Sequence, residues 1–226
     1  MNIQIPQWKR WWSYVSEIKL EETYSEYNEY LCVSLQEGRI QLSTADAIYS
    51  FADKYDNFRH AFERIKLPDK ANVLLLGFGL GSIPYMLEKK FNRQYTYTGV
   101  EIDGEVIRLA SKYVLPDLSG DITLVEADAR IFLMQDTTRY NIIAMDIFVG
   151  SKVPEDLQTI AYLELLRESL SEGGILIFNL LASQTTGKKH ALEYFEHVFK
   201  IVFPAGGYMD TGGNLLLIND TGKVIK

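Results

Sequence analysis

The chain has 226 residues, a length that fits one large domain or one domain with a small additional part. Its 47% hydrophobic and 23% charged residues exclude a disordered or low-complexity protein. One cysteine excludes a disulfide framework, and the three histidines lack the spacing of a metal site. The net charge of −7 would repel phosphate backbones, so we expect no nucleic acid as the main partner.

The sequence does not predict a membrane protein, because no apolar stretch reaches the roughly 20 residues that a spanning helix needs. The best candidate, Ile175 to Ala182, is interrupted by Asn179 and is typical of a buried strand. The N-terminus has no uninterrupted apolar segment of the kind found in secretory signals. We therefore expect a cytoplasmic protein without a membrane partner.

The first 50 residues are predicted to form a small β-rich part. The segment from Ile18 to Ser50 is rich in Tyr, Val, Ile and Thr and is broken at Glu37-Gly38, which predicts an antiparallel sheet with a hairpin turn. From Ala52 to Ile65, apolar residues recur at three- and four-residue spacing, which predicts a helix. We expect two domains, residues 1–50 and 51–226.

The rest of the chain alternates apolar runs with segments of helical period. The runs predict buried strands at Val73–Leu76, Tyr95–Val100, Ile122–Val125, Ile142–Ile147 and Ile175–Leu180. The segments between them predict helices at Pro84–Phe91, Glu105–Tyr113, Arg130–Met134 and Glu155–Leu170. Such alternation implies crossover units and a parallel sheet that is covered by helices on both faces.

The C-terminal part is predicted to add one helix and two strands. The helix lies near Lys188–Phe199, and the strands lie near Lys200–Phe203 and Asn214–Ile218. A short Gly-rich stretch separates the two strands, so we expect them to pair antiparallel. The predicted fold class is therefore α/β, with a seven-stranded sheet whose last strand is reversed and a small N-terminal β-hairpin domain.

The first strand of this sheet is followed by a glycine-rich turn. In open parallel sheets, ligands bind at the carboxyl ends of the strands, near the point where the strand order reverses. Gly77, Gly79 and Gly81 allow tight turns and close approach of a ligand to the main chain. A dinucleotide site is typical of G-x-G-x-x-G, but the last position here is Ser82. The spacing therefore favours a nucleoside without pyrophosphate, and a merely structural turn is the alternative.

Acidic residues follow the next three strands. Glu101 ends the second strand, where a carboxylate is placed to accept hydrogen bonds from both ribose hydroxyls, unless it is a solvated surface acid. Asp128 follows the third strand, where it can accept a hydrogen bond from an exocyclic amine or only cap the next helix. Asp146 follows the fourth strand, and a partly buried acid there needs a hydrogen-bonding partner or a cationic ligand. Asp103 is expected to cap the helix that follows it.

These motifs resemble the spermidine synthase family, within the class I S-adenosylmethionine-dependent methyltransferase (Rossmann-like) fold. The resemblance covers roughly residues 30 to 218. Its markers are VLLLGFGLG at Val73–Gly81, VEID at Val100–Asp103, ADA at Ala127–Ala129, the strand end at Asp146 and QLSTAD at Gln41–Asp46. It implies that residues 51–226 bind S-adenosylmethionine or its decarboxylated form, without a metal.

The resemblance also implies roles for individual residues. The cofactor would be bound by Gln41, Gly77, Gly79, Gly81, Glu101, Ile102, Asp128 and Ala129, with the glycines at its methionine part, Glu101 at the ribose, and Asp128 and Ala129 at the adenine. Asp146 would be the catalytic residue at the reacting centre, and Tyr49 and Phe148 would bind the acceptor. The family associates through its N-terminal region, which implies a homodimer.

The sequence departs from the family on the acceptor side. Leu80 stands where polyamine-making members carry an acid between the glycines, and Val149 replaces the second acid of their D-S-S-D loop. The D-E-F-x-Y segment becomes Asp46–Ser50, with the glutamate lost. We therefore expect a pocket that is more apolar than a diamine site. The leading hypothesis is a transferase that moves a methyl group, slightly favoured, or an aminopropyl group to a small acceptor.

Two other functions compete with this hypothesis. The first is a catalytically degenerate nucleoside-binding or interaction module, which predicts a hydrophobic pocket wall around Leu80, Phe148 and Val149. The second is a nicotinamide oxidoreductase, which is weakened by Ser82 in place of the last glycine. Outside the site, the N-terminal tryptophan cluster is expected to pack a terminal segment onto the domain or onto a neighbouring subunit.

Overall fold

The computed structural model describes residues 5–45, 48–54, 56–150, 152–183 and 185–225. After a short helix, α1 (Gln7–Trp12), the N-terminal part forms an antiparallel sheet in the order β1-β2-β3-β4. Its strands are β1 (Ile18–Thr23), β2 (Leu31–Gln36), β3 (Arg39–Ser43) and β4 (Ile48–Ser50). The predicted hairpin turn is confirmed, because Glu37 and Gly38 join β2 to β3 with φ of 50° and 76°, which suits a tight two-residue turn.

The second sheet has seven strands in the order β10-β11-β9-β8-β5-β6-β7. Its strands are β5 (Asn72–Leu76), β6 (Thr96–Glu101), β7 (Asp121–Glu126), β8 (Tyr140–Met145), β9 (Leu170–Leu181), β10 (Gly207–Asp210) and β11 (Asn214–Ile218). Strands β5 to β9 pair in parallel, whereas β11 runs antiparallel to β9 and to β10. The predicted α/β fold and reversed last strand are therefore confirmed, and the strand order reverses at β5.

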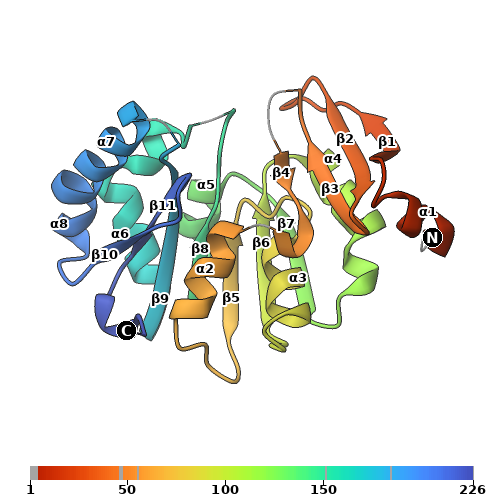
Figure 1. Cartoon of the computed structure of the whole chain (residues 1–226). Coiled ribbons are helices and arrows are strands. Elements are labelled where there is room, and N and C mark those ends of the chain that lie inside the picture. The colour runs from red at the N-terminus through yellow and green to blue at the C-terminus, as the bar shows by residue number, and fades with distance from the viewer. Residues whose placement is uncertain (1–4, 46–47, 55, 151, 184, 226) are drawn as a thin grey trace.

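Helices cover both faces of this sheet (Figure 1). One face is covered by α2 (Asp56–Arg64), α3 (Ser82–Lys89) and α4 (Gly104–Tyr113), and the other by α5 (Ala129–Gln135), α6 (Ile160–Ser169), α7 (Thr185–Tyr194) and α8 (Lys200–Val202). The apolar side chains form two clusters, one on each face. Neighbouring residues of β5 alternate between them, since Leu75 packs in one and Leu74 in the other. This alternation explains why the strands read as continuous apolar runs.

The strand predicted at Lys200–Phe203 is wrong. A π-helical turn, Phe195–Phe199, continues α7 into α8 without a break. The reason is the helical spacing of Phe199 and Val202, which are both buried in the cluster beneath α6 and α7. The strand that pairs with β11 is instead β10, which begins at Gly207, opposite Ile218.

Two predicted helices begin later than expected. The segment from residue 155 starts with a 3₁₀ turn, Glu155–Gln158, and α6 begins only after Thr159, whose hydroxyl accepts a hydrogen bond from the backbone N–H of Tyr162 at 3.2 Å. The segment from residue 52 likewise starts with a 3₁₀ turn, Ala52–Lys54, before α2. In both cases the apolar residues have helical spacing, but the α-helix itself begins several residues inside the predicted range.

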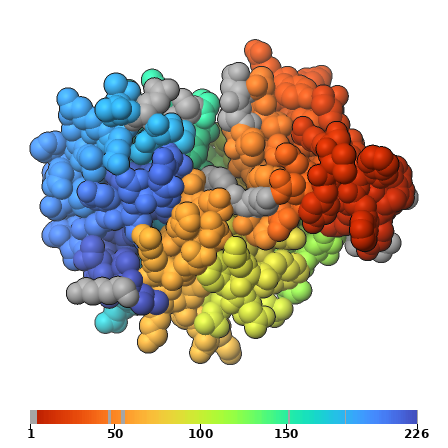
Figure 2. Space-filling model, in the orientation of Figure 1, coloured from red at the N-terminus to blue at the C-terminus, as the bar shows by residue number. Residues whose placement is uncertain are grey.

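The tryptophans of α1 are largely exposed, although α1 itself is held to the turn between β2 and β3, where Nη1 of Arg10 donates to the carbonyl oxygen of Gly38 at 3.3 Å. Trp8, Trp11 and Trp12 are 60%, 76% and 60% exposed, and the N-terminal residues project at one side of the molecule (Figure 2). The terminal segment thus contacts the domain, as one of the two expected alternatives required, and contact of the tryptophans with a neighbouring subunit stays a prediction. Over the described part of the chain, no helix combines the length and the apolar character needed to cross a bilayer.

Candidate functional site

The carboxyl ends of β5, β6 and β8 are held side by side by backbone hydrogen bonds that continue past the strands. The N–H of Gly77 donates to the carbonyl oxygen of Val100 at 2.9 Å, and the N–H of Asp146 donates to that of Leu76 at 2.8 Å. Because the strand order reverses at β5, the connections leave toward opposite faces and open a crevice between them. The glycine turn and Asp146 therefore meet at the mouth of this crevice.

The glycine turn is fixed by two close contacts. Gly77 has a φ of +82°, and a Cβ at this position would lie 2.5 Å from the carbonyl oxygen of Asp146, so only glycine fits. Gly79 has a φ of +54°, and its N–H donates to Oε2 of Glu101 at 3.0 Å. The turn thus contacts Asp146 on one side and Glu101 on the other.

Ser82 is not the N-cap of α3. The helix begins at Ser82 itself, with Gly81 in the preceding position. The Ser82 hydroxyl instead shares a hydrogen bond with the hydroxyl of Ser50 at 2.6 Å and accepts one from the N–H of Phe51 at 3.1 Å. These contacts tie the end of β4 to the glycine turn.

The strand ends border a cavity of about 920 Å³. Nine of the predicted site residues line it: Tyr49, Gly77, Gly79, Glu101, Ile102, Asp128, Ala129, Asp146 and Phe148. The three carboxylates that the sequence placed at separate strand ends therefore share one cavity with the glycine turn. Their roles toward a ligand remain predictions.

Two predicted site residues do not line this cavity. Gly81 completes the turn behind it. Gln41 is buried in β3 opposite Ser34 of β2, and its Oε1 has no hydrogen-bond partner within the described residues. Adjacent residues of a strand face opposite sides, and Leu42, not Gln41, shares the side that packs into the core. Asp46, which ends the same motif, lies outside the described residues.

The charge of the cavity has one sign. The described lining includes the carboxylates of Glu101, Asp103, Asp128, Asp146 and Asp156 and contains no lysine, arginine or histidine. A cleft lined by negative charge concentrates cations and repels phosphates. The lining is thus suited to a sulfonium or ammonium group and unsuited to the pyrophosphate of a dinucleotide.

Glu101 is held in place by three backbone amides. Oε2 accepts from Gly79 at 3.0 Å, and Oε1 accepts from Ile102 at 3.0 Å and from Asp103 at 3.3 Å. Burial raises the pKa of Glu101 above its ordinary value, and the three amides only partly oppose this effect. A carboxylate has about four acceptor positions, so one remains for a ligand hydroxyl.

Asp128 and Asp146 each accept a side-chain hydrogen bond from a neighbouring element. Oδ1 of Asp128 accepts from the N–H of Ile131 at 2.9 Å, so this residue is the N-cap of α5 as well as part of the cavity wall. Oδ1 of Asp146 accepts from Nδ2 of Asn179 on β9 at 2.9 Å. The buried Asn179 had appeared in the sequence only as an interruption of an apolar run.

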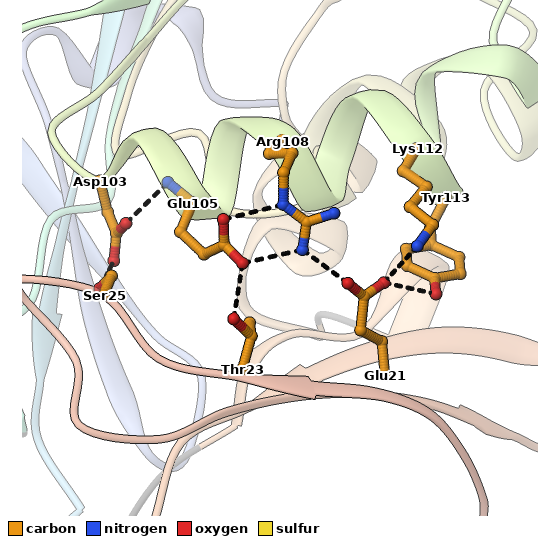
Figure 3. A network of polar contacts seen from close by, with 8 residues as sticks. All are labelled: Glu21, Thr23, Ser25, Asp103, Glu105, Arg108, Lys112 and Tyr113. Atoms are coloured by element: carbon orange, nitrogen blue, oxygen red, sulfur yellow. Dashed lines mark hydrogen bonds and ion pairs between the residues drawn. The ribbon is translucent and has the colours of Figure 1, made fainter. Parts of the chain in front are cut away.

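The N-terminal sheet is attached to α4 by a row of polar contacts (Figure 3). Glu21 of β1 accepts hydrogen bonds from Arg108, Lys112 and Tyr113 at 2.6, 2.6 and 2.7 Å. Partial burial raises the pKa of Glu21, but the bonds from Lys112, Tyr113 and Arg108 outweigh it and lower the pKa to about 2. The sheet is therefore anchored by charge as well as by its apolar side.

Asp103 extends this row to the cavity. Its Oδ1 accepts from the N–H of Glu105 at 3.0 Å, which confirms the predicted cap of α4. Its Oδ2 accepts from the hydroxyl of Ser25 at 2.5 Å and from Nδ2 of Asn28 at 2.8 Å. Tyr27 and Asn28 line the cavity, so the loop between β1 and β2 forms part of the wall and is fixed to the end of β6.

The part of the cavity wall where the sequence predicted acceptor binding includes several apolar side chains. Tyr49 and Phe148 line it as predicted, together with Val149, but Leu80 is buried in the core and does not. Burial, followed by the charge of Glu101, raises the pKa of Tyr49, while the backbone N–H of Gly150 opposes the shift. Tyr49 of β4 and the loop after β8 thus line the same cavity.

Several residues of the cavity wall were not predicted, because no sequence motif contains them. They are Tyr27, Asn28, Asn57, Asp156 and Asn214. They come from loops, a short turn, a helix and the reversed strand, whose positions depend on packing rather than on a motif. Across the residues that the structure describes, no three histidine, cysteine or acidic side chains are grouped to hold a metal ion.

No family model matches the chain. It is 31% identical over 115 residues to a probable polyamine aminopropyl transferase of Bifidobacterium longum, a match that covers 50% of this chain and 25% of the relative. It is 29% identical over 119 residues to the polyamine aminopropyltransferase of Vibrio vulnificus, covering 51% and 40%. A 30% match over 114 residues to an N-terminal histidine N-methyltransferase of Emericella nidulans covers 48% and 20%. The matches thus span less than half of each relative.

Solved structures agree on the architecture. A probable spermidine synthase from Corynebacterium glutamicum superposes with a TM-score of 0.63 at 19% identity, covering 88% of this chain and 78% of that one. The chain has a spermidine synthase-like fold. Human methyltransferase-like protein 13, solved in complex with SAH (S-adenosylhomocysteine), has a TM-score of 0.54 at 20% identity and covers 67% of this chain and 72% of its own. The spermidine synthase-like fold thus belongs to the wider class I methyltransferase architecture.

Proposed function

We propose that this chain is a transferase that binds S-adenosylmethionine or its decarboxylated form and transfers a methyl or aminopropyl group to a small amine. The observation that carries the proposal is the meeting of Glu101, Asp128 and Asp146 with the glycine turn on one cavity. The relatives support it, since two are named as aminopropyltransferases and one as an N-methyltransferase. A non-catalytic module is not favoured by these relatives.

The wall residues fit an adenosyl sulfonium compound. Glu101 retains an acceptor position for a ribose hydroxyl, and Asp128 uses only Oδ1 in its helix cap, so Oδ2 is the atom proposed to accept from the adenine amine. Ile102 and Ala129 would flank the adenine ring. The negative lining would stabilise the positive sulfur.

Asp146 is the proposed catalytic residue. The bound sulfonium supplies an activated carbon: the acceptor nitrogen forms a bond to it, and the electron pair of the broken C–S bond stays on the sulfur. An alkylammonium has a pKa near about 10.4, so its nitrogen must lose a proton before it attacks. Asp146 would orient the amine and accept or relay that proton, while the cavity walls exclude water.

The group transferred is proposed in order of preference. Methyl transfer comes first, because Leu80 takes the place of an acid that polyamine-making enzymes of the resembled family use, and its side chain is buried in the core. Aminopropyl transfer is second. One observation supports it: the described cavity lining has no basic side chain to pair with the carboxylate of intact S-adenosylmethionine, and decarboxylated S-adenosylmethionine lacks that carboxylate.

Isothermal titration with four compounds tests the cofactor site: SAH, methylthioadenosine, decarboxylated S-adenosylmethionine and NAD. We expect the adenosyl sulfur compounds to bind and NAD not to bind. Mass spectrometry of a panel of amines would then detect transfer, and Asp146→Asn should keep cofactor binding while losing turnover. Failure of every adenosyl sulfur compound to bind would refute the proposal, and binding without transfer to any amine would favour the non-catalytic module.

For partners, we propose a small-molecule acceptor, no nucleic acid, and a homodimer in which α1 meets the second copy. The exposed tryptophans of α1 support the last point, since large apolar side chains at a surface mark contact sites. Light scattering of the wild type and of Trp11→Ser would measure it. A monomeric wild type would contradict this part of the proposal alone.

A further inference from the structure

Asp146 is the first member of a chain of three polar side chains. Asn179 on β9 is fully buried between apolar neighbours. Its Nδ2 donates to Oδ1 of Asp146 at 2.9 Å, and its Oδ1 accepts from Nδ2 of Asn214 at 2.8 Å. The ends of three neighbouring strands, β8, β9 and β11, thus each contribute one member. Asn214 is only 7% exposed and lines the cavity.

The direction of this chain follows from hydrogen-bonding chemistry. A carboxylate can only accept, so Asn179 must turn its nitrogen toward Asp146 and its oxygen away. That oxygen can only accept, so Asn214 must turn its nitrogen toward Asn179. Oδ1 of Asn214 therefore ends this series of hydrogen-bonded side chains, and it can accept a hydrogen bond. This orientation is the one that an ionised Asp146 requires, because a protonated carboxyl could also donate.

We propose that Asn179 is a positioning residue for Asp146 and that Asn214 is a further acceptor-binding residue, which recognises a hydrogen-bond donor on the substrate. The inference rests on the proposed function and names its substrate class. The acceptor is an amine with a second, neutral N–H or O–H donor, such as an amino alcohol or an amino amide. Its nucleophilic nitrogen lies at Asp146 and its second donor at Asn214.

The neutral character of the second donor follows from the surroundings of Asn214. An amide oxygen satisfies a hydroxyl, but it does not offset the cost of desolvating a second ammonium group. The helix α2 packs against β11. Its residue Asn57 also lines the cavity and is neutral. Two cavity acids belong to elements of the other face of the sheet, since Asp128 caps α5 and Asp156 lies in the 3₁₀ turn that precedes α6.

Three amines of similar length test the substrate class: 4-aminobutan-1-ol, pentylamine and 1,4-diaminobutane. Each is measured as kcat/KM and, on the SAH-loaded protein, as Kd by titration. We expect the wild type to prefer the amino alcohol over pentylamine about 10-fold, the scale of one hydrogen bond. Asn214→Leu should bring this ratio to about 1, and Asn214→Asp should move the preference to the diamine, since a carboxylate can pair with its second ammonium.

Asn219 provides the matched control at the other end of the same sheet. Its Oδ1 accepts from the N–H of Leu176 at 2.9 Å and its Nδ2 donates to the carbonyl of Gly174 at 3.1 Å. Asn219→Leu should reduce stability but keep the wild-type ratio between the amines. If Asn214→Leu also keeps that ratio, or if the wild type prefers pentylamine, the substrate class is overturned.

The positioning role of Asn179 is tested by pH. In Asn179→Asp, two adjacent carboxylates cannot both ionise readily, so the acidic limb of the kcat/KM profile should move up by about 1 unit or more. In wild-type protein without ligand, the side-chain amide NMR signals of Asn179 and Asn214 should follow the titration of Asp146. Asp146→Asn should abolish that response at both residues, and Asn179→Leu should abolish it at Asn214.

This NMR measurement distinguishes a failure of the inference about Asn179 and Asn214 from a failure of the proposed function. If cofactor binding fails but the amides respond to Asp146, the hydrogen bonds that link Asp146, Asn179 and Asn214 are supported and the proposed function is refuted. If the cofactor binds but the Asn214 amide ignores the titration of Asp146, the inference is overturned and the proposed function stands. An unmoved acidic limb in a folded Asn179→Asp protein would likewise show that Asn179 is only structural.

Discussion

Gly77 lies directly against the backbone of Asp146, with room for a hydrogen but not for a methyl group. The contact joins the end of β5 to the end of β8, where the strand order reverses. The shape of the glycine turn and the position of Asp146 are therefore coupled. A disturbance of one must move the other.

Gly77→Ala is expected to lower the free energy of unfolding by about 2–3 kcal/mol, from a left-handed φ that costs about 1–2 kcal/mol and from the contact with Asp146. It should also weaken SAH binding. Gly173→Ala is the matched control, since Gly173 has a φ of +69° and nothing within 4 Å of its Cβ position. Denaturant unfolding and titration measure both effects. Equal losses in the two variants would mean that the contact with Asp146 has no energetic role.

Glu101→Gln is expected to weaken SAH binding about 10- to 100-fold, because charged hydrogen bonds are worth roughly 1.5–3 kcal/mol. Glu126→Gln is the control: Glu126 ends β7 opposite Glu101 but does not line the cavity. Since burial raises the pKa of Glu101, its protonation begins at a higher pH than for an ordinary glutamate. Wild-type affinity should therefore fall on acidification already above pH 4.5, and that of Glu101→Gln should not. Titrations at several pH values test this: if the SAH affinities of the wild type and of Glu101→Gln depend on pH in the same way, Glu101 is not the group involved.

Asp128→Asn separates the helix cap from ligand binding. Asparagine also caps helices, so this variant should keep the stability of α5 to within about 0.5 kcal/mol, whereas Asp128→Ala should lose about 1 kcal/mol. If Asp128 accepts a hydrogen bond from adenine, both variants should bind SAH more weakly. Unfolding curves and titrations decide between the roles. Full affinity in Asp128→Asn would restrict this residue to capping.

Glu21→Gln is expected to destabilise the fold by about 1 kcal/mol near neutral pH, allowing for solvent screening of a partly exposed group. The pKa of Glu21 is lowered to about 2, so its contribution is complete above the ordinary value of 4.5 and is lost as the pH falls toward 2. The wild type and the variant should therefore converge in stability below pH 4.5. Glu17→Gln, at an exposed position before β1, is the control. A difference that persists at pH 2 would exclude the ion pairs as its cause.

The sequence predicted the central sheet well because strands buried on both faces carry unbroken apolar runs, as at Val73–Leu76. Residues directly after such strands lie at one edge whatever the details of register. The meeting of Gly77, Glu101 and Asp146 could therefore be predicted without knowing any side-chain contact. The strand predicted at Lys200–Phe203 was wrong because the three apolar residues in it are too few to distinguish a strand period from a helical one.

Local patterns did not predict most of the other half of the cavity. Tyr49 was expected there only through the family resemblance, Asn28 reaches the cavity through the docking of the N-terminal sheet, and Asn214 reaches it through the return of the reversed strand. The side of β3 that faces the core also depends on that docking, which is why Gln41 is not on the cavity wall. Local sequence patterns do not encode these long-range placements.

The carboxylate of Asp103 collects three separate segments at one point: the end of β6, the start of α4 and the loop that bears Ser25 and Asn28. A shortened protein that starts after residue 50 would lose that loop together with β4. The half of the cavity that β5, β6 and β8 form would then be open to water, and the proposed sulfonium cofactor would not be enclosed there. Any attempt to transplant this site onto another scaffold must carry both pieces.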